Sequence, residues 1–355
     1  MNVDETARAS SSNGPASTGE RGNGTPAIEA HDLRRVFGTN EAVAGIELDV
    51  PPGEIYGFLG PNGAGKSTTV KMLCTLLNPT SGSASVAGFD VATRPGEVRL
   101  RIGVALQDAS IDGKQTGREL LDLQGRLYGL TRSDIDRRMD DVIGLVDIGD
   151  AIDDRVESYS GGMRRRLDLA MSLIHRPQIL FLDEPTTGLD PASRVAVWQE
   201  IRRLNREVGM TIFLTTQYLE EADELADRVG IIAGGRIEAE GTPTELKRSI
   251  GTDLIVATVD GEPESAIRAL EELPEIDRVD VHGNELSLAT TDGSAMIARV
   301  AVALDGCGVT VTSLTLRTPT LDDVFLDVTG SHLSAEDGFG VSDDTGDDQT
   351  PESAS

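Results

Sequence analysis

Apolar and polar residues alternate, or form short continuous apolar runs, at several places in the first two thirds of the chain. The run AVAGIELDV, within residues 27 to 50, predicts antiparallel strands, and PPGEIYGFLG predicts a turn and then an apolar strand. QILFLDEP (178 to 185) and MTIFLTT (210 to 216) predict buried strands, with a helix between them from about Ala192 to Val208. This alternation of strands and helices is typical of a parallel sheet with crossover helices.

Other segments have the period of an amphipathic helix. Residues 66 to 77 fit one helix, which Asn78 and Pro79 would stop. Between Gly117 and Arg176 the pattern is amphipathic, as in RELLDLQGRLYGL, and strand signals are almost absent. This second stretch therefore predicts a helical subdomain.

The pattern of apolar and polar residues changes after about Gly251. A strand (DLIVATVDG), a helix (ESAIRALEEL), two strands (IDRVDVHGNELSLATTDG), a second helix (SAMIARVAVAL) and a last strand (VTVTSLTL) follow in order. This order predicts a small separate α+β domain of split-βαβ type at residues 251 to 330. The domain before it is predicted to span residues 27 to 250.

Both ends of the chain lack the residues that build a core. Residues 1 to 26 are rich in Ser, Thr, Gly and Asn, and residues 331 to 355 contain seven acidic residues and no Lys or Arg. Such segments bury too little apolar surface to offset the entropy that is lost on ordering. We predict a disordered tail at each end.

The whole chain is strongly acidic. It contains 60 Asp and Glu residues against 32 Lys and Arg, for a formal net charge of −28, and only four residues are lysine. A negative field of this size argues against binding to nucleic acid or to anionic lipid head groups. Because self-repulsion would be screened best in a saline cytoplasm, we hypothesise a halophilic source.

Cysteine content and hydropathy favour a reducing cytoplasm. Cys74 and Cys307 are far apart and give neither a disulfide framework nor metal-ligand spacing. The sequence has no apolar run of bilayer-spanning length and no signal-peptide start. A role at a membrane would therefore need a partner chain that spans it.

The most specific motif is GPNGAGKST, which fits G-x-x-x-x-G-K-[ST] between an apolar strand and a helix. Its backbone N–H groups would cradle phosphate oxygens, Lys66 would bridge the β and γ phosphates, and the Ser67 hydroxyl would bind Mg²⁺. A glycine turn that only joins strand to helix is the alternative. The predicted nucleotide-binding residues are Gly60, Pro61, Asn62, Gly63, Ala64, Gly65, Lys66, Ser67 and Thr68.

A second motif places two carboxylates at the end of a buried strand. In ILFLDEP, four apolar residues lead into Asp183 and Glu184, at the strand edge where ligands bind in such sheets. Asp183 would hold the metal ion through its water shell, and Glu184 would orient or deprotonate the attacking water. Alone, a DE pair after a strand favours a solvated turn; the phosphate-binding motif upstream reverses that preference.

A third motif, YSGGMRRRLDLA, begins a helix with Ser160, Gly161 and Gly162. By itself it is an N-cap followed by two small residues. Between the other two motifs it predicts a second phosphate clamp, because a helix N-terminus presents free N–H groups. Arg164 to Arg166 are expected to face solvent or the ATP-bound interface.

Together the three motifs resemble the ATP-binding subunit of ABC transporters. In that family the serine-glycine-glycine signature of one subunit closes over the γ-phosphate held by the P-loop of another. The resemblance therefore implies a head-to-tail pair of nucleotide domains.

Three further positions match the pattern of this family. Phe37 lies where the family has an aromatic residue that stacks on adenine; an ordinary core phenylalanine is the alternative. Gln107, in IGVALQDAS, matches the glutamine loop that touches Mg²⁺ and senses the membrane partner. Asp190, in TTGLDP, matches the loop that crosses the dimer interface, and it can also cap the helix that starts near Pro191.

The stretch IFLTTQYLEEAD falls where the family has its switch loop. The residue that contacts the γ-phosphate there is normally histidine, and this chain has Gln217. A glutamine amide can donate to a phosphate oxygen and accept from the lytic water, but it cannot carry a proton charge. Catalysis would then depend more completely on Glu184. Gln217 and the ending TPTLDDVFLDVTG, residues 318 to 330, resemble the daunorubicin-resistance type of drug exporter subunit.

The resemblance covers residues 27 to 330 and implies an α/β P-loop NTPase fold. Its parts are a mixed core sheet, an antiparallel β subdomain and a helical subdomain, followed by the α+β domain. We predict an ATPase with ATP and Mg²⁺ as cofactors, which pairs with a second copy at the cytoplasmic face of the membrane. It would power a separate membrane permease that exports drug, antibiotic or lipid-like cargo.

Two alternatives stay open at this point. One is a soluble ABC ATPase without a permease, which the single P-loop and the lack of sustained heptads disfavour. The other is a regulatory ATP-binding module with weak hydrolysis. Gln217 makes this second alternative conceivable, and the intact pair of Asp183 and Glu184 argues against it.

Overall fold

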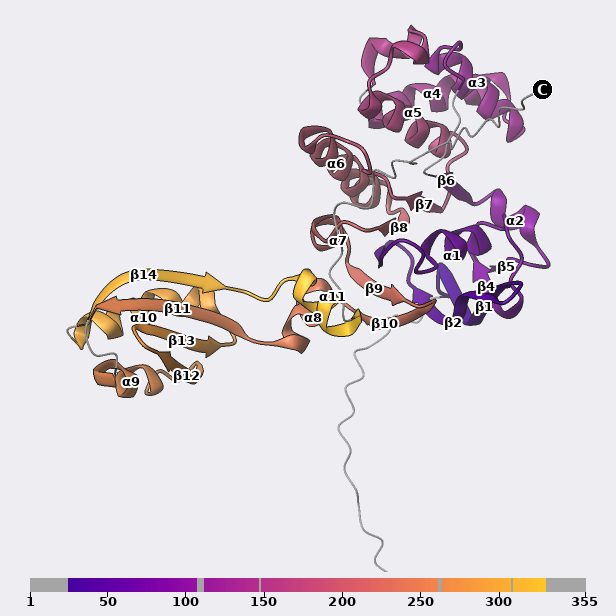
Figure 1. The fold of residues 1–355 in the computed structure, drawn as a ribbon. Helices are drawn as coiled ribbons and strands as arrows, with labels where there is room; N and C mark the ends of the chain where they lie inside the picture. The colour runs from indigo at the N-terminus through magenta and orange to yellow at the C-terminus, as the bar shows by residue number, and fades with distance from the viewer. Residues whose placement is uncertain (1–24, 107–111, 147, 261–263, 308, 330–355) are drawn as a thin grey trace, which may run out of the picture.

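The computed structural model describes residues 25–106, 112–146, 148–260, 264–307 and 309–329, which form three sheets and the helices around them (Figure 1). The expected fold class is confirmed, because a mixed core sheet, an antiparallel sheet, a helical subdomain and an α+β sheet are all present. Within these residues, no helix combines the length and the apolar character that a membrane span requires.

The core sheet is mixed. Its strands, in spatial order, are β10 (Arg236–Gly241), β9 (Arg228–Ala233), β3 (Ile55–Leu59), β8 (Thr211–Thr216), β7 (Ile179–Asp183) and β6 (Ile102–Ala105). The edge strand β10 runs antiparallel to β9, and the other pairs are parallel. The crossover helices α6 (Pro191–Val208) and α7 (Leu219–Leu225) join β7 to β8 and β8 to β9.

Strands β7 and β8 place alternate side chains on opposite faces of the core sheet, as a period of two requires. Leu180 and Leu214 belong to the hydrophobic cluster on the helical side. Phe181 and Phe213 belong to the cluster that faces the antiparallel sheet, with ring centroids 5.6 Å apart. Because both faces are covered, these strands are apolar throughout rather than alternating with polar residues.

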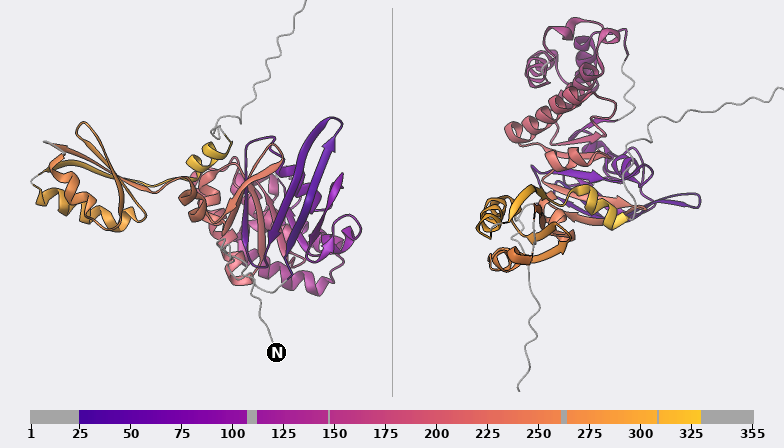
Figure 2. Two further views of the ribbon diagram at one scale, coloured as in Figure 1. Left: turned by 90° about the horizontal axis from the view of Figure 1, so that it is seen from below. Right: turned by 60° about the vertical axis from the view of Figure 1, so that its left-hand side comes forward.

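The antiparallel sheet packs against one face of the core sheet. It contains β1 (Ile28–Phe37), β2 (Asn40–Val50), β4 (Ser81–Val86) and β5 (Phe89–Asp90), in the spatial order β2-β1-β4-β5. Figure 2 shows the long hairpin of β1 and β2, in indigo, beside the core sheet. Helix α1 (Lys66–Leu73) contacts β2, β4 and β7 and so lies between the two sheets.

Helix α1 is shorter than the predicted span of residues 66 to 77. It ends at Leu73, and Thr75 adopts a left-handed φ of 62°, which a continuing helix does not tolerate. Arg99, at the end of α2 (Pro95–Arg99), holds this turn by donating to the hydroxyl of Thr75 (2.8 Å) and to its carbonyl oxygen (3.0 Å). A tertiary contact, and not Asn78 or Pro79, therefore accompanies the end of the helix.

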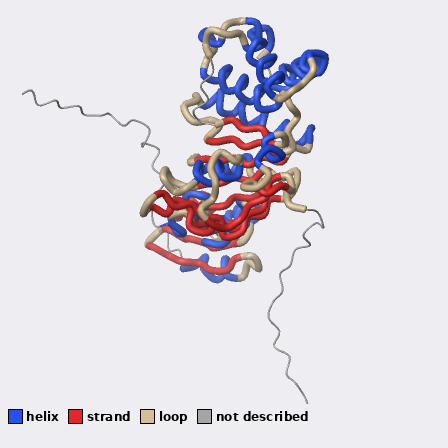
Figure 3. Tube along the Cα trace, turned by 90° about the vertical axis from the view of Figure 1, so that its right-hand side faces the viewer, coloured by secondary structure: helices blue, strands red, loops and turns tan. Residues whose placement is uncertain are grey.

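The helical subdomain predicted between residues 117 and 176 is present. Its helices are α3 (Gly117–Leu127), α4 (Arg132–Val146) and α5 (Gly161–Leu173), with short 3-10 turns at Gly149–Asp153 and Val156–Ser158. Thr116 and Glu119 form a capping box that starts α3. Figure 3 shows these helices gathered at one end of the molecule, above the core sheet.

The C-terminal sheet has the split-βαβ arrangement that the sequence predicts. After α8 (Pro243–Ile250) come β11 (Asp253–Asp260), α9 (Glu264–Glu271), β12 (Ile276–His282), β13 (Glu285–Thr290), α10 (Gly293–Gly306) and β14 (Thr310–Arg317). The strand order is β12-β13-β11-β14, with every pair antiparallel. In Figure 1 this sheet and its two helices stand apart from the core sheet.

The last helix, α11 (Leu321–Thr329), leaves the C-terminal sheet and packs on α8 and α7. Leu321, Val324 and Phe325 are buried in one cluster with Leu59 of β3 and Leu246 of α8. The chain therefore crosses twice between its two parts, once after α8 and once before α11 (Figure 1).

Candidate functional site

The predicted phosphate-binding loop joins β3 to α1 and uses glycines in conformations that other residues avoid. Gly63 and Gly65 have φ values of 78° and 110°, and a Cβ on Gly65 would lie 2.5 Å from a backbone oxygen of β2. Lys66 begins α1, and its Nζ donates to the carbonyl oxygens of Gly60 (2.8 Å) and Pro61 (3.1 Å). The loop therefore folds over its own lysine.

Lys66 is almost completely buried, with 4% of its surface exposed. Burial lowers the pKa of Lys66, and the neighbouring carboxylate of Glu184 offsets part of this effect. In the rest of the predicted loop, Asn62 is exposed, Ala64 is buried, and Ser67 and Thr68 lie half-buried in the first turn of α1.

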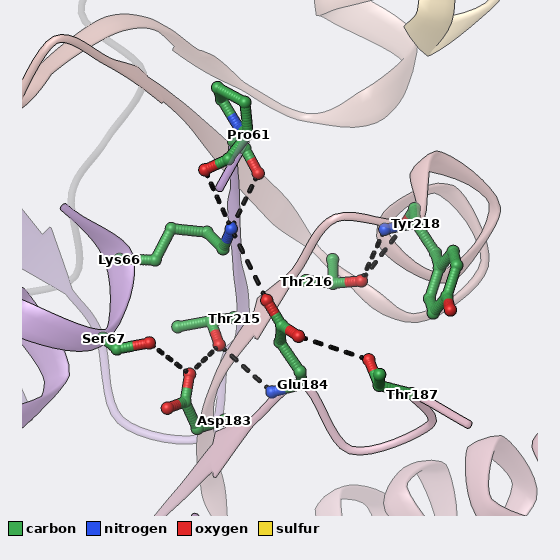
Figure 4. A network of polar contacts seen from close by, with 10 residues as sticks. Pro61, Lys66, Ser67, Asp183, Glu184, Thr187, Thr215, Thr216 and Tyr218 are labelled. Carbon is green, nitrogen blue, oxygen red and sulfur yellow. Dashed lines mark hydrogen bonds and ion pairs between the residues drawn. The ribbon is translucent and has the colours of Figure 1, made fainter. Parts of the chain in front are cut away.

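Asp183 is the last residue of β7 and points toward the loop (Figure 4). Its Oδ1 accepts hydrogen bonds from the hydroxyl of Ser67 at 3.3 Å and from the hydroxyl of Thr215, on β8, at 2.5 Å. Because Asp183 is buried, these two donors replace the hydrogen bonds that water would make to its carboxylate. The structure thus brings together the predicted metal-binding residues Ser67 and Asp183.

Glu184 follows Asp183 with an unusual backbone. Its φ is 48°, in the left-handed region that costs energy for a residue with a side chain. Its N–H donates to the carbonyl and hydroxyl oxygens of Thr215, each at 3.1 Å. The carboxylate lies 3.6 Å from Lys66 Nζ and accepts from the Thr187 hydroxyl at 3.3 Å (Figure 4). The turn therefore points Glu184 back at the phosphate-binding loop.

The signature motif begins α5, in the helical subdomain. Ser160 is the N-cap, and its side chain accepts from the N–H of Met163 at 3.2 Å. Ser160 and Gly161 are exposed. The loop before α6 lies beside this motif, because a Cβ added to Gly161 would be 3.7 Å from the Leu189 side chain. The amides at this helix N-terminus are therefore on the surface of the chain, in a different part of the molecule from α1 (Figure 1).

Asp190 is the N-cap of α6, as the local alternative predicts. Its carboxylate accepts from the N–H groups of Ala192 (3.1 Å) and Ser193 (3.0 Å) and from the Ser193 hydroxyl. These hydrogen bonds lower the pKa of Asp190. The residue is exposed, so the capping role leaves it accessible to a second subunit.

Phe37 lies at the end of β1 with 46% of its surface exposed, so it is not a core residue. The guanidinium of Arg35 lies 4.5 Å from the centre of the Phe37 ring.

Gln217 follows the end of β8 and is half-buried. The turn that carries it is closed by the Tyr218 N–H, which donates to the Thr216 hydroxyl at 2.8 Å. The predicted Gln107 lies outside the described residues.

Of Arg164 to Arg166, which are expected to face solvent or the ATP-bound interface, Arg165 does not face solvent. Its guanidinium is 15% exposed and donates to the carbonyl oxygens of Pro185 (3.0 Å) and Asp183 (3.4 Å) and to the Asp168 carboxylate (3.0 Å). Burial raises the pKa of Asp168 to about 6, and Arg165 opposes that rise.

Comparisons with known proteins match both parts of the chain. The family model described as ABC transporter matches residues 43–187, and the model described as ATP-binding protein DrrA1-3-like, C-terminal domain, matches residues 241–329. Among solved structures, an ATP-binding subunit of an ABC transporter has a TM-score of 0.57 at 26% identity. The match covers 63% of this chain and 92% of that one.

Curated relatives extend the match over most of the sequence. The daunorubicin resistance ATP-binding protein DrrA3 of Streptomyces coeruleorubidus is 45% identical over 306 residues, covering 86% of this chain and 96% of the relative. The linearmycin resistance ATP-binding protein LnrL of Bacillus subtilis is 34% identical over 309 residues, covering 86% and 99%.

The P-loop, the buried carboxylate pair and the fold together define an ABC-type ATPase. More closely, the chain belongs to the family of DrrA-type drug-resistance ATP-binding proteins of ABC transporters.

Proposed function

We propose that this chain is the ATP-hydrolysing subunit of an ABC exporter, paired with a second copy and attached to a separate permease at the cytoplasmic face of the membrane. The observation that carries this proposal is the buried contact of 3.6 Å between Lys66 and Glu184, beside a P-loop. Relatives named for resistance to daunorubicin, doxorubicin and linearmycin support a drug or antibiotic cargo.

Magnesium fits the residues at the strand end. Ser67 and Asp183 offer a hydroxyl and a carboxylate oxygen 3.3 Å apart, the donor type that Mg²⁺ prefers. Across the described residues there is no group of three or more His, Cys, Asp or Glu that could hold a metal alone, which fits an ion held by two side chains and substrate phosphates. Bound Mg²⁺ would neutralise charge on the phosphates.

The side chains around the loop divide the work of hydrolysis. The loop N–H groups and Lys66 bind the phosphates, and Phe37 stacks on the adenine. Glu184 orients or deprotonates the attacking water, and Gln217 contacts the γ-phosphate. Ser160 to Gly162 of the second copy complete the site, because Ser160 and Gly161 are exposed and α5 lies in another part of its own chain.

We also propose that residues 27 to 250 form the ATP-binding domain and residues 251 to 330 the small C-terminal domain. The separate sheet of β11 to β14 supports this division. Helix α11 belongs to the second domain in sequence, yet it is buried against the first.

The test is Mg²⁺-dependent ATP hydrolysis by the purified protein in high salt, with and without the co-purifying permease. Glu184→Gln should keep ATP binding and lower kcat by about 100-fold or more, because the amide cannot accept a proton. Glu207→Gln, exposed on α6, is the matched control and should behave as wild type. Turnover that is unchanged in Glu184→Gln would overturn the role of Glu184, and wild-type protein that never hydrolyses ATP would overturn the proposed function.

A regulatory module with weak hydrolysis is the second candidate, and Gln217 is the observation that favours it. Gln217→His separates the two proposals. If Glu184 drives hydrolysis, this substitution should change kcat by no more than about ten-fold, because it exchanges one hydrogen-bond donor for another, a difference of about 1 kcal/mol. Wild-type protein that binds ATP without turnover, and gains turnover only in Gln217→His, would favour the regulatory candidate.

A further inference from the structure

Glu221 is a completely buried carboxylate that lies outside the set of residues proposed to bind or hydrolyse ATP. It lies in α7, with 0% of its surface exposed. Its Oε1 accepts from the Thr186 hydroxyl at 2.8 Å and from the indole N–H of Trp198 at 2.9 Å. Burial raises the pKa of Glu221, and the donors around it offset this rise only in part. Because burial of a carboxylate costs free energy, the position of Glu221 needs a structural or functional explanation.

The partners of Glu221 lie on segments that also carry candidate active-site residues. Thr186 lies two residues after Glu184, on the turn that leaves β7. Trp198 lies in α6, the helix that Asp190 caps. Glu221 itself lies four residues after Gln217, in the helix that follows the switch loop. A single buried oxygen atom therefore joins the turn after β7 to helices α6 and α7.

The contact between Trp198 and Glu221 lies in the middle of a row of side-chain contacts between α6 and α7. Arg194, Trp198 and Arg202 are spaced by four residues and so share one face of α6. The guanidinium of Arg194 lies 4.5 Å from the centre of the Tyr218 ring, and Arg202 Nη1 lies 2.9 Å from Glu224 Oε1. Arg202 and Glu224 are 36% and 52% exposed, so solvent weakens that outer pair. The hydrogen bond from Trp198 to the fully buried Glu221 is the strong contact of the row.

The left-handed φ of Glu184 gives such an anchor a function. A strained backbone persists only where the surrounding structure over-determines it. On one side the Glu184 N–H is held by Thr215 of β8. On the other side the Thr186 hydroxyl is held by its hydrogen bond to Glu221. Arg165 also holds this turn by donating to the Pro185 carbonyl oxygen, so loss of Glu221 would release one of several anchors while leaving the phosphate-binding loop intact.

We propose that Glu221 is a positioning residue for ATP hydrolysis, which holds Glu184 in its strained turn and makes the switch loop move together with it. A shift of Gln217 on contact with phosphate would then reach the loops of Glu184 and Asp190 through α7 and Glu221. The proposal rests on the proposed role of Glu184 in hydrolysis. The competing explanation is that Glu221 only stabilises the packing of α6 on α7.

The experiment compares kcat and KM for ATP with thermal unfolding of the full-length chain. Thr186→Val removes only the hydroxyl that Glu221 binds, and Glu221→Gln keeps an acceptor oxygen for both donors. We expect Thr186→Val and Glu221→Ala each to lower kcat about ten-fold or more while KM stays within about two-fold, the pattern of a lost transition-state contact. Glu221→Gln should restore most of the rate.

The matched control is Glu224→Ala, which breaks the exposed pair between the same two helices. It should leave both kinetic constants unchanged. The double variant of Thr186→Val with Glu221→Ala should be no slower than Glu221→Ala alone, because the two residues act through one contact.

Two results would overturn the inference while wild-type hydrolysis stands. One is a Thr186→Val protein with wild-type kcat, which stays informative even where Glu221→Ala fails to fold. The other is a fall in kcat for Glu224→Ala that matches the fall for Glu221→Ala, which would assign the effect to general helix packing. Wild-type protein without hydrolysis would instead overturn the proposed function.

Discussion

Asp183 and Thr215 are paired residues on the neighbouring parallel strands β7 and β8, and the Thr215 hydroxyl donates to Asp183 Oδ1 at 2.5 Å. The same hydroxyl accepts from the N–H of Glu184 at 3.1 Å. One side chain therefore orients both carboxylate residues, the first through its oxygen and the second through its backbone.

Replacement of Thr215 by valine, which has a similar shape, should disturb both residues. We expect the free energy of unfolding to fall by about 1–3 kcal/mol, the usual effect of leaving a buried charged group without one donor. We also expect kcat for ATP to fall by at least ten-fold. Urea denaturation and steady-state ATPase assays measure the two effects.

Thr211→Val is the matched control for this experiment. The Thr211 hydroxyl accepts from the Gly53 N–H at 2.8 Å, at the other end of the same strand. This control should lose stability but keep kcat. Equal losses of kcat in both variants would contradict a specific role for Thr215.

Phe325→Ala should destabilise the first part of the chain, although Phe325 lies near the end of the described sequence. The side chain is fully buried in the cluster with Leu59 and Leu246. Truncation of a buried phenylalanine costs about 3–5 kcal/mol. Thermal unfolding of full-length protein measures the loss.

Phe37→Ala is the matched aromatic control for stability, because Phe37 is about half exposed. It should change the unfolding free energy by less than about 1 kcal/mol and raise KM for ATP. A stable Phe325→Ala protein would show that α11 contributes little to the core.

The stability of the protein should fall with rising pH because of Glu54. Burial raises the pKa of Glu54 from its ordinary 4.5 to about 7, and the nearby Arg228 guanidinium opposes this shift. Between these two values the folded state binds more protons than the unfolded state, so stability decreases as pH rises.

Glu54→Gln removes this titration. The stability of the variant relative to wild type should therefore grow between about pH 4.5 and 7 and then stay constant. Urea midpoints measured across this range provide the test. A difference that is the same at every pH would contradict the assignment.

High salt should stabilise the protein, as the hypothesis of a halophilic source requires. With a formal net charge of −28, surface repulsion is strong in dilute buffer and is screened when the Debye length falls from about 10 Å at 0.1 M salt to about 3 Å at 1 M. We expect Tm to rise over this range of KCl.

Sucrose is the control for the salt experiment, because it is excluded from protein surfaces without screening charge. It should give a smaller rise in Tm than KCl does. Full stability in dilute buffer would contradict the hypothesis.

The parts of the fold that depend on local pattern could be predicted from the sequence. The apolar runs of β7 and β8 and the strand order of the C-terminal domain follow from periodicity and turn signals. The positions of Lys66, Ser67 and Asp183 follow from motif spacing, because parallel strands end at one edge of the sheet.

Features that depend on contacts between distant residues could not be predicted. Glu221 stands in an acidic helix, LEEADEL, where its neighbour Glu220 is exposed, and the sequence does not separate the two. Arg165 is buried by contacts with backbone oxygens, which have no sequence signature. The early end of α1 is accompanied by a contact from Arg99, which approaches Thr75 from another helix.

The return of α11 onto the first part of the chain makes the C-terminal α+β unit an inserted domain rather than an appended one. A truncation after residue 250 would remove that unit together with apolar cover from Leu59, the residue that leads into the P-loop. Excision of the segment between α8 and α11, with a short linker in its place, would remove the same sheet and keep the cover. The inserted sheet therefore has two boundaries, one after α8 and one before α11, and both must be cut to remove it without uncovering the core.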